Sequence, residues 1–298
     1  MTFRRGARLD PSQVRDVRGR GLGGSMGGRG MAIGGGGGLI GLVAVVIIYF
    51  LSNSGGGTPT SGLDQLINQP IGQPGASSNL AQECRTGQDA NERDDCRIVG
   101  YVNSIQAYWE ETFPEFGNRY TPATTTFFDG SIETACGPAS SASGPFYCPN
   151  DQDIYLDLGF FNELKTRFGA TGGSLSQGYV IAHEYGHHVQ NLLGDLGRQD
   201  PGAEGGSVRT ELQADCYAGV WANNAVETGY LEPISDQQIA DALSAAAAVG
   251  DDRIQQSAGG AVNPHKWTHG SSEQRQEWFL IGHRGGRPGD CDTFRSDI

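Results

Sequence analysis

Two histidines and a glutamate stand close together in the middle of the chain, at a spacing suited to binding a metal ion and activating water. His183 and His187 are four residues apart in a segment with helical periodicity. Their imidazoles therefore project from one helix face and can reach one tetrahedral zinc ion. Glu184 follows the first histidine, where its carboxylate can take a proton from a water at the open metal position and return it to a leaving amine. The same three residues also occur by chance on amphipathic helices, so context has to decide.

A pair of acidic residues further along the chain supplies that context. Zinc needs a third protein ligand if one position is to stay open for water. Glu211 and Asp215 are one helical turn apart in a segment that is apolar on several sides. Carboxylates on such a helix are expected to be partly buried and to need a partner, whereas on an ordinary surface helix they would be solvated. We expect Glu211 to be the third ligand and Asp215 to accept the free ring N–H of a ligand histidine.

Two neighbours of the histidine pair have different expected roles. Gly186 is a poor helix former, which indicates that something packs closely against that turn. His188 points about 100° away from His187 on a helix. We therefore expect His188 to pack or to form hydrogen bonds rather than to reach the same metal.

These segments resemble the putative neutral zinc metallopeptidase family of bacterial membrane-anchored proteins, and more widely the gluzincins. The matching stretches are 144–149, 155–158, 183–190, 211–216 and 268–275, so the resemblance spans roughly residues 80 to 285. It implies a zincin-like domain with one catalytic Zn²⁺ held by His183, His187 and Glu211. It also implies that Glu184 is the base and that Asp215 supports a ligand.

Two further assignments concern the reacting peptide. His269 lies in a segment similar to the histidine-containing stretch of related membrane peptidases, and the resemblance implies a donor that stabilises the oxyanion. A surface histidine is the alternative. Other cationic side chains also compete for the role: His265, Arg253 and Arg275. Residues 155–158 are expected to be an edge strand that pairs with an extended peptide substrate, although a plain half-buried strand fits their alternation equally.

The elements that must position these residues make an α+β domain, mainly helical with a small sheet. Alternation and β-prone residues predict strands at 124–128 and 153–158. Apolar periodicity and capping signals predict the helices. They are expected at 96–111, 175–193, 207–224, 235–249 and from Ser271 or Ser272 to Ile281.

Charge is distributed unevenly along the chain. The first thirty residues carry seven arginines and two aspartates, whereas the whole chain has a formal net charge of −13. We expect residues 1–30 to be a disordered, Gly/Arg-rich tail. The acidic remainder argues against a nucleic-acid partner, because phosphate binding needs a clustered positive surface.

An uncharged run follows this tail. Residues 31–51 are long enough to cross a bilayer as a single helix, and the arginines lie on one side only. The positive-inside rule then predicts a single-pass protein whose N-terminus is cytoplasmic. A flexible linker at 52–79 would lead to a catalytic domain at 80–298, in the periplasm or at the cell exterior. A cleaved signal peptide is the alternative to this anchor.

All six cysteines follow the apolar run, as expected for an exported domain stabilised by disulfides. Proximity favours Cys84 with Cys96 and Cys136 with Cys148, which leaves Cys216 with Cys291. A cysteine zinc site would normally show a closer Cys-x-x-Cys spacing.

Together these features predict a membrane-anchored zinc endopeptidase that acts on proteins or peptides. One alternative is a zinc-stabilised binding or scaffold protein without turnover. Another is a hydrolase of a non-protein amide such as cell-wall peptide. The residue pattern identifies neither the substrate nor the oligomeric state.

Overall fold

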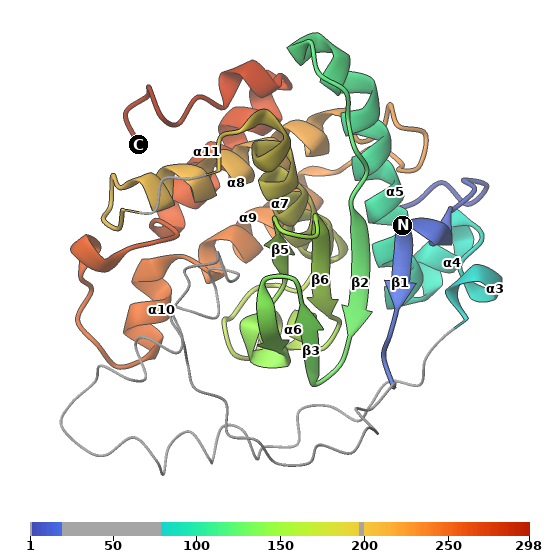
Figure 1. Ribbon diagram of the computed structural model, residues 1–298, viewed down its shortest axis with the longest axis horizontal. Helices are drawn as coiled ribbons and strands as arrows, with labels where there is room; N and C mark the ends of the chain where they lie inside the picture. The colour runs from blue at the N-terminus through green and yellow to red at the C-terminus, as the bar shows by residue number, and fades with distance from the viewer. Residues whose placement is uncertain (1, 20–78, 197–199) are drawn as a thin grey trace.

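The described part of the chain contains a four-stranded sheet with helices packed against one of its faces (Figure 1). The computed structural model describes residues 2–19, 79–196 and 200–298. The strand order is β1-β2-β6-β5, in which β1, β2 and β6 run parallel and β5 runs antiparallel to β6. Their bounds are β1 Val14–Asp16, β2 Thr124–Phe128, β5 Phe146–Cys148 and β6 Asp153–Asp157.

The remaining elements follow in chain order. A separate hairpin consists of β3 Ser131–Thr134 and β4 Gly137–Ser140. The helices are α3 Leu80–Glu83, α4 Gly87–Glu92, α5 Asp94–Thr112, α6 Phe160–Thr166, α7 Ser174–Leu193, α8 Gly206–Asn224, α9 Asp236–Ala248, α10 Asp251–Ser257 and α11 Ser272–Gly285. Short 3₁₀ turns occur at η1 Pro11–Gln13, η2 Phe113–Phe116, η3 Ser141–Ser143, η4 Pro264–Lys266 and η5 Pro288–Asp290.

The main helices and strands agree with the α+β prediction. Helix α7 ends at Leu193, as expected, and Gly194 caps it with a φ of 81° in the left-handed region. Helix α9 opens with the expected capping box between Ser235 and Gln238. Helix α11 runs past the expected Ile281 to Gly285, because Gly286 supplies its left-handed cap. The elements missed in the sequence are short, and their periodicity is correspondingly weak.

The expectation that residues 155–158 form an edge strand is wrong. Residues 155–157 belong to β6, which is hydrogen-bonded to β2 on one side and to β5 on the other. Side-chain alternation reports which faces of a strand are buried, not which strands lie beside it. The edge nearest to β6 is β5.

The sheet is covered on both faces. Phe127, Ile154 and Leu156 lie in the main core with the helices, and Thr125 is hydrogen-bonded to Tyr185 of α7. On the opposite face a smaller apolar cluster packs under the β3–β4 hairpin. It contains Phe128, Phe146, Cys148 and Tyr155. The sheet is thus a backing layer for α7.

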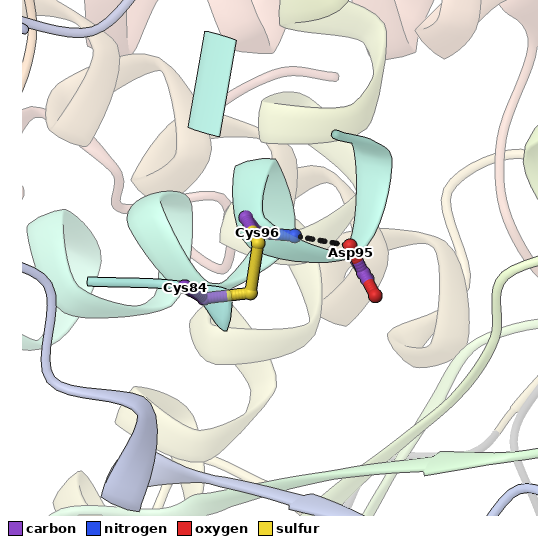
Figure 2. Close-up of side chains that lie close together, drawn as sticks. All are labelled: Cys84, Asp95 and Cys96. Atoms are coloured by element: carbon purple, nitrogen blue, oxygen red, sulfur yellow. Dashed lines mark hydrogen bonds between the residues drawn. A yellow bond between two sulfur atoms is a disulfide. The ribbon is translucent and has the colours of Figure 1, made fainter. Parts of the chain in front are cut away.

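All three expected disulfides are present: Cys84–Cys96, Cys136–Cys148 and Cys216–Cys291. Figure 2 shows the first of them, with Asp95 accepting the backbone N–H of Cys96 at 2.9 Å. These three residues resemble a metal cluster by type and proximity. Because the two sulfurs are bonded to each other, no thiolate is left there to bind a metal.

The expectation of a disordered tail is wrong for residues 2–19, and the domain therefore does not begin at residue 80. β1 pairs with β2, and Phe3, Leu9 and Val14 are buried in the main core. The Gly/Arg-rich composition predicted disorder, but three well-spaced apolar side chains are enough to hold this short polar segment against the core. The rest of the predicted tail, the span at 31–51 and the linker through residue 78 lie outside the described residues. Within the described part of the chain, no helix is long and apolar enough to span a membrane.

Candidate metal centre

Helices α7 and α8 pack closely against each other at a glycine. A Cβ placed on Gly186 would lie 2.9 Å from the Cα atom and 3.1 Å from the Cβ atom of Ala214. Carbon atoms normally pack at about 3.5–4.0 Å, so only glycine permits this approach. The predicted close packing is confirmed, and it brings the histidine face of α7 against Glu211 of α8.

Three side-chain atoms converge at this crossing. His183 Nε2 lies 3.2 Å from Glu211 Oε2, and His187 Nε2 lies 3.4 Å from Glu211 Oε1. The three ligand atoms are all within 4.8 Å of one another. Tetrahedral zinc with bonds of about 2.0–2.1 Å separates its ligand atoms by about 3.3 Å. Glu211 is 2% exposed, and its Oε1 has no hydrogen-bond partner among the described residues. These residues fit a zinc ion.

Each ligand histidine is oriented through its other ring nitrogen. His183 Nδ1 lies 2.8 Å from Asp215 Oδ1, as the sequence led us to expect, and His187 Nδ1 lies 2.8 Å from Gln190 Oε1. Gln190 is held in turn, because its Nε2 donates to Thr210 O at 2.7 Å and to Gln213 Oε1 at 2.9 Å. These bonds place the Nδ1 protons so that both Nε2 atoms are free to bind metal. Sequence reasoning missed Gln190, although its i+3 spacing from His187 was a usable signal.

Asp215 is the centre of a buried hydrogen-bond cluster. Arg275 of α11 binds both carboxylate oxygens of Asp215, with Nε–Oδ2 at 2.8 Å and Nη2–Oδ1 at 3.0 Å. Tyr179 donates its O–H to Asp215 Oδ1 at 2.5 Å. In the sequence Arg275 was only a competitor for the oxyanion role. The structure instead places it behind Asp215, where it fixes the carboxylate that orients His183.

The electrostatics of the site favour a cation. Burial alone lowers the pKa of the His183 imidazole, but the carboxylates of Asp215 and Glu211 outweigh this effect and raise the pKa to about 10. Burial raises the pKa of Glu211, yet the two neighbouring histidines hold it well below its ordinary value. For Glu184, burial dominates and raises the pKa of the carboxyl group. A raised pKa suits a carboxylate that must accept a proton.

His188 does not join the ligands. It is 0% exposed, its Nδ1 accepts from Tyr147 O–H at 3.0 Å, and its Nε2–H donates to Thr121 O at 2.7 Å. Burial lowers its pKa to about 4, so the ring is neutral at pH 7. The expected packing and hydrogen-bonding role is confirmed. Through Tyr147, His188 also ties α7 to the edge strand β5.

His269 is an internal residue, so the alternative of a surface histidine is wrong. It is 1% exposed, and its Nδ1 lies 3.2 Å from Asp251 Oδ1. Asp251 Oδ2 also accepts the backbone N–H groups of Thr268, His269 and Gly270. These bonds fix the loop before α11, and among the described residues no hydrogen bond joins His269 to the metal ligands. The competing His265 and Arg253 are exposed.

The site opens on the side of its histidines. The side chains of His183 and His187 are 9% and 12% exposed, whereas that of Glu211 is 2% exposed. Glu184 retains 7% exposure next to His183. His183, His187 and Glu184 thus keep a small contact with solvent, whereas Glu211 and Arg275, each 2% exposed, are enclosed.

Comparisons with known proteins agree with this chemistry. The family model described as "Putative neutral zinc metallopeptidase" matches residues 1–294. An uncharacterized protein of Mycobacterium tuberculosis is 56% identical over 222 residues, which cover 71% of this chain and 74% of that protein. The uncharacterized protein YpfJ of Escherichia coli K12 is 38% identical over 301 residues, which cover 98% of both chains. No solved structure matches.

Proposed function

Because the chain belongs to the putative neutral zinc metallopeptidase family, we propose that it is a zinc-dependent endopeptidase with a zincin-like catalytic domain. The observation that carries this proposal is the convergence of His183, His187 and Glu211 at 3.2 and 3.4 Å, with Glu184 beside the first ligand. A purely structural zinc site has four protein ligands and needs no base. Here three ligands and a neighbouring carboxylate favour turnover over a scaffold role.

The proposed chemistry divides between metal and protein. A bound zinc ion supplies a Lewis acid that polarises the peptide carbonyl and acidifies water. Glu184 accepts the proton of the attacking water and passes it to the amine nitrogen as the C–N bond breaks. Asp215 and Gln190 keep the two Nε2 atoms aimed at one point, and Arg275 keeps Asp215 ionised and fixed.

The proposed substrate is an extended peptide. In the described part of the chain, β5 is hydrogen-bonded to β6 and forms one edge of the sheet, with β1 at the other. It also packs near α7, because Tyr147 contacts His188 and Asn191. An extended peptide can add to such an edge through its backbone. We assign this role to β5 in place of β6.

We further propose that the domain works outside the cytoplasm and that residues 31–51 attach it to a membrane. Three disulfides favour an oxidising compartment. The apolar composition of residues 31–51 favours membrane attachment.

The test compares the full-length protein with Glu184→Gln. We expect both to bind one equivalent of zinc and the variant to lose peptide cleavage by a factor of about 10²–10⁴, because general base catalysis contributes that much. Equal cleavage by the variant would show that Glu184 is not the base. Bound zinc without cleavage across broad peptide libraries would favour the scaffold alternative. Cleavage restricted to cell-wall peptides would favour the non-protein amide.

A further inference from the structure

We infer that the N-terminal segment, residues 2–19, lies on the same side of the membrane as the catalytic domain and is held there by a surface of α4, α5 and β2 built to receive it. This inference concerns topology and does not depend on the proposed peptidase activity. It replaces the expectation of a cytoplasmic N-terminus.

Two asparagine side chains of the domain are satisfied by the backbone of this segment. Asn91 Oδ1 accepts the N–H groups of Thr2 and Phe3 at 3.0 Å each, and Asn91 Nδ2 donates to Phe3 O at 2.8 Å. Asn103, 1% exposed, accepts from Asp10 N at 2.8 Å and donates to Asp10 O at 2.9 Å. Both amides thus take backbone partners from the segment. Asn103 is buried in the docked arrangement, where an amide needs such partners.

Two glycines make room for the segment. Phe3 is 1% exposed and packs edge-on against Tyr101, with ring centroids 4.9 Å apart. A Cβ on Gly100 would lie 2.5 Å from the Phe3 ring, and a Cβ on Gly87 would lie 1.9 Å from Arg4 O. Gly100 lies in the interior of α5, where glycine is otherwise unfavourable, and Gly87 is the first residue of α4. The α4–α5 surface is therefore shaped to receive residues 3 and 4.

Two arginines of the segment have partners on the domain. Arg15, whose side chain is 54% exposed, binds Asp153 at 2.6 Å beside the β1–β2 pairing. Arg18 is 9% exposed, lies 3.5 Å from Asp95 and sits over the Phe127 ring at 5.3 Å. The positive-inside rule counts such arginines as free charges that stay in the cytoplasm. Here they have acidic and aromatic partners on the domain.

The segment also braces the helix of the candidate metal centre. Thr2 Oγ1 lies 2.8 Å from the hydroxyl of Ser174, the first residue of α7. Tyr101, against which Phe3 packs, donates its O–H to Ser174 O at 2.9 Å. Loss of the segment would therefore loosen the start of the ligand helix.

These contacts cannot form across a bilayer, whose hydrocarbon core is about 30 Å thick. A chain that crossed the membrane once between residues 19 and 79 would separate the segment from its surface. The inference therefore replaces a single crossing by residues 31–51 with attachment of that apolar run to one face of the membrane. The docked arrangement therefore requires residues 2–19 to reach the compartment of the disulfide-bonded domain.

An engineered disulfide tests this arrangement in cells. Arg8 and Thr86 face each other in an isolated antiparallel bridge, flanked by the hydrogen bonds Leu9 N to Arg85 O and Gly87 N to Ala7 O at 2.9 and 2.8 Å. Such a non-hydrogen-bonded pair has a Cα separation of about 4.5 Å, which a disulfide can bridge. We would express full-length Arg8→Cys/Thr86→Cys with a protease site inserted between residues 20 and 78. After cleavage, the fragments would be separated with and without reductant.

The expected result is two fragments that stay joined until reduction. A control pair, Arg8→Cys/Glu273→Cys, should give separate fragments because α11 lies across the molecule from α4 (Figure 1). A disulfide-linked dimer of chains would show docking onto a second copy and overturn the inference for a single chain. Absence of the link in cells would overturn it as well.

A second readout does not depend on disulfide formation. Gly6 is exposed, and a Cβ there would meet no atom within 4 Å, so Gly6→Cys should fold normally. We expect a membrane-impermeant maleimide to label Gly6→Cys on the outer face of the membrane. Labelling only after lysis would place the segment in the cytoplasm and refute the inference.

Discussion

Substitution of Gly186 by alanine tests whether the α7–α8 crossing sets the geometry of the metal centre. The added methyl carbon would meet the Cα, O and Cβ atoms of Ala214 at 2.9, 3.0 and 3.1 Å. Two of these three atoms are backbone, so no rotamer change relieves the overlap. Restoring contacts of about 3.5–4.0 Å requires the helices to separate locally by roughly 0.5–1 Å.

The effects on stability and on zinc binding should differ. Alanine gains about 1 kcal/mol over glycine in a helix, whereas overpacking costs about 1–3 kcal/mol. The metal-free protein should therefore lose only about 0–2 kcal/mol of unfolding free energy. The ligands, however, lie on both sides of the crossing, and zinc bonds tolerate displacements of only about 0.2 Å. We expect zinc affinity to fall by about 10–100-fold, on the order found when ligand orientation is disturbed.

Two measurements separate these effects. Competition with a chromophoric chelator gives the zinc affinity, and urea unfolding of the metal-free protein gives the stability. Gly6→Ala is the matched control, since its methyl carbon meets no atom within 4 Å. If Gly186→Ala bound zinc as tightly as the parent protein and unfolded at higher urea, the crossing would not control the site.

Three further outcomes follow from the same contacts. Arg275→Met leaves the Asp215 carboxylate buried without its cation. Removing one member of a buried ion pair costs about 3–5 kcal/mol of unfolding free energy. We expect a loss of about 3 kcal/mol, because Tyr179 and His183 still bind Asp215. Urea unfolding checks this value, and a loss under 1 kcal/mol would contradict it. Glu211→Ala should weaken zinc binding far more than His188→Gln in the chelator assay, and the reverse order would exclude this ligand set. Burial lowers the pKa of His188 to about 4, below its unfolded value of about 6.5, so the related stability is fully present above pH 6.5. About 3 kcal/mol should be lost as the pH falls from about 6.5 to 4. His188→Gln should show a shallower dependence of unfolding free energy on pH over that range, and an unchanged slope would rule out this residue as the cause.

Sequence reasoning was strongest where the determining interactions are local. The spacing of His183 and His187 and that of Glu211 and Asp215 follow from one helical turn, which is fixed by the backbone. Helix ends could be predicted for the same reason, because the caps Gly194 and Ser235 bond only to residues a few positions away. The contact between the histidine face of α7 and the acidic face of α8 could be inferred only because neither helix alone supplies enough ligands for a zinc ion.

The parts that sequence could not supply depend on tertiary neighbours. Arg275 is 60 residues from Asp215, so no periodicity links them. The edge position of β5 depends on strand order, which alternation within 155–158 does not encode. The docking of residues 2–19 was hidden because Arg15 and Arg18 count as bare charges until their partners, Asp153 and Asp95, are seen beside them.

Charge balance supports a metal ion beside Arg275 at the candidate centre. Glu184, Glu211 and Asp215 are at most 7% exposed, and three buried carboxylates cannot remain ionised without compensation. Arg275 offsets one negative charge and leaves two, which a divalent cation matches. Without a metal ion, a proton on His183 can offset part of this negative charge. The carboxylates of Asp215 and Glu211 accordingly raise the pKa of His183 to about 10. Because metal and protons compete for the same buried charge, binding of zinc should be coupled to proton release. The second helix, which supplies Glu211 and Asp215, is therefore as important to the candidate metal centre as the histidine pair.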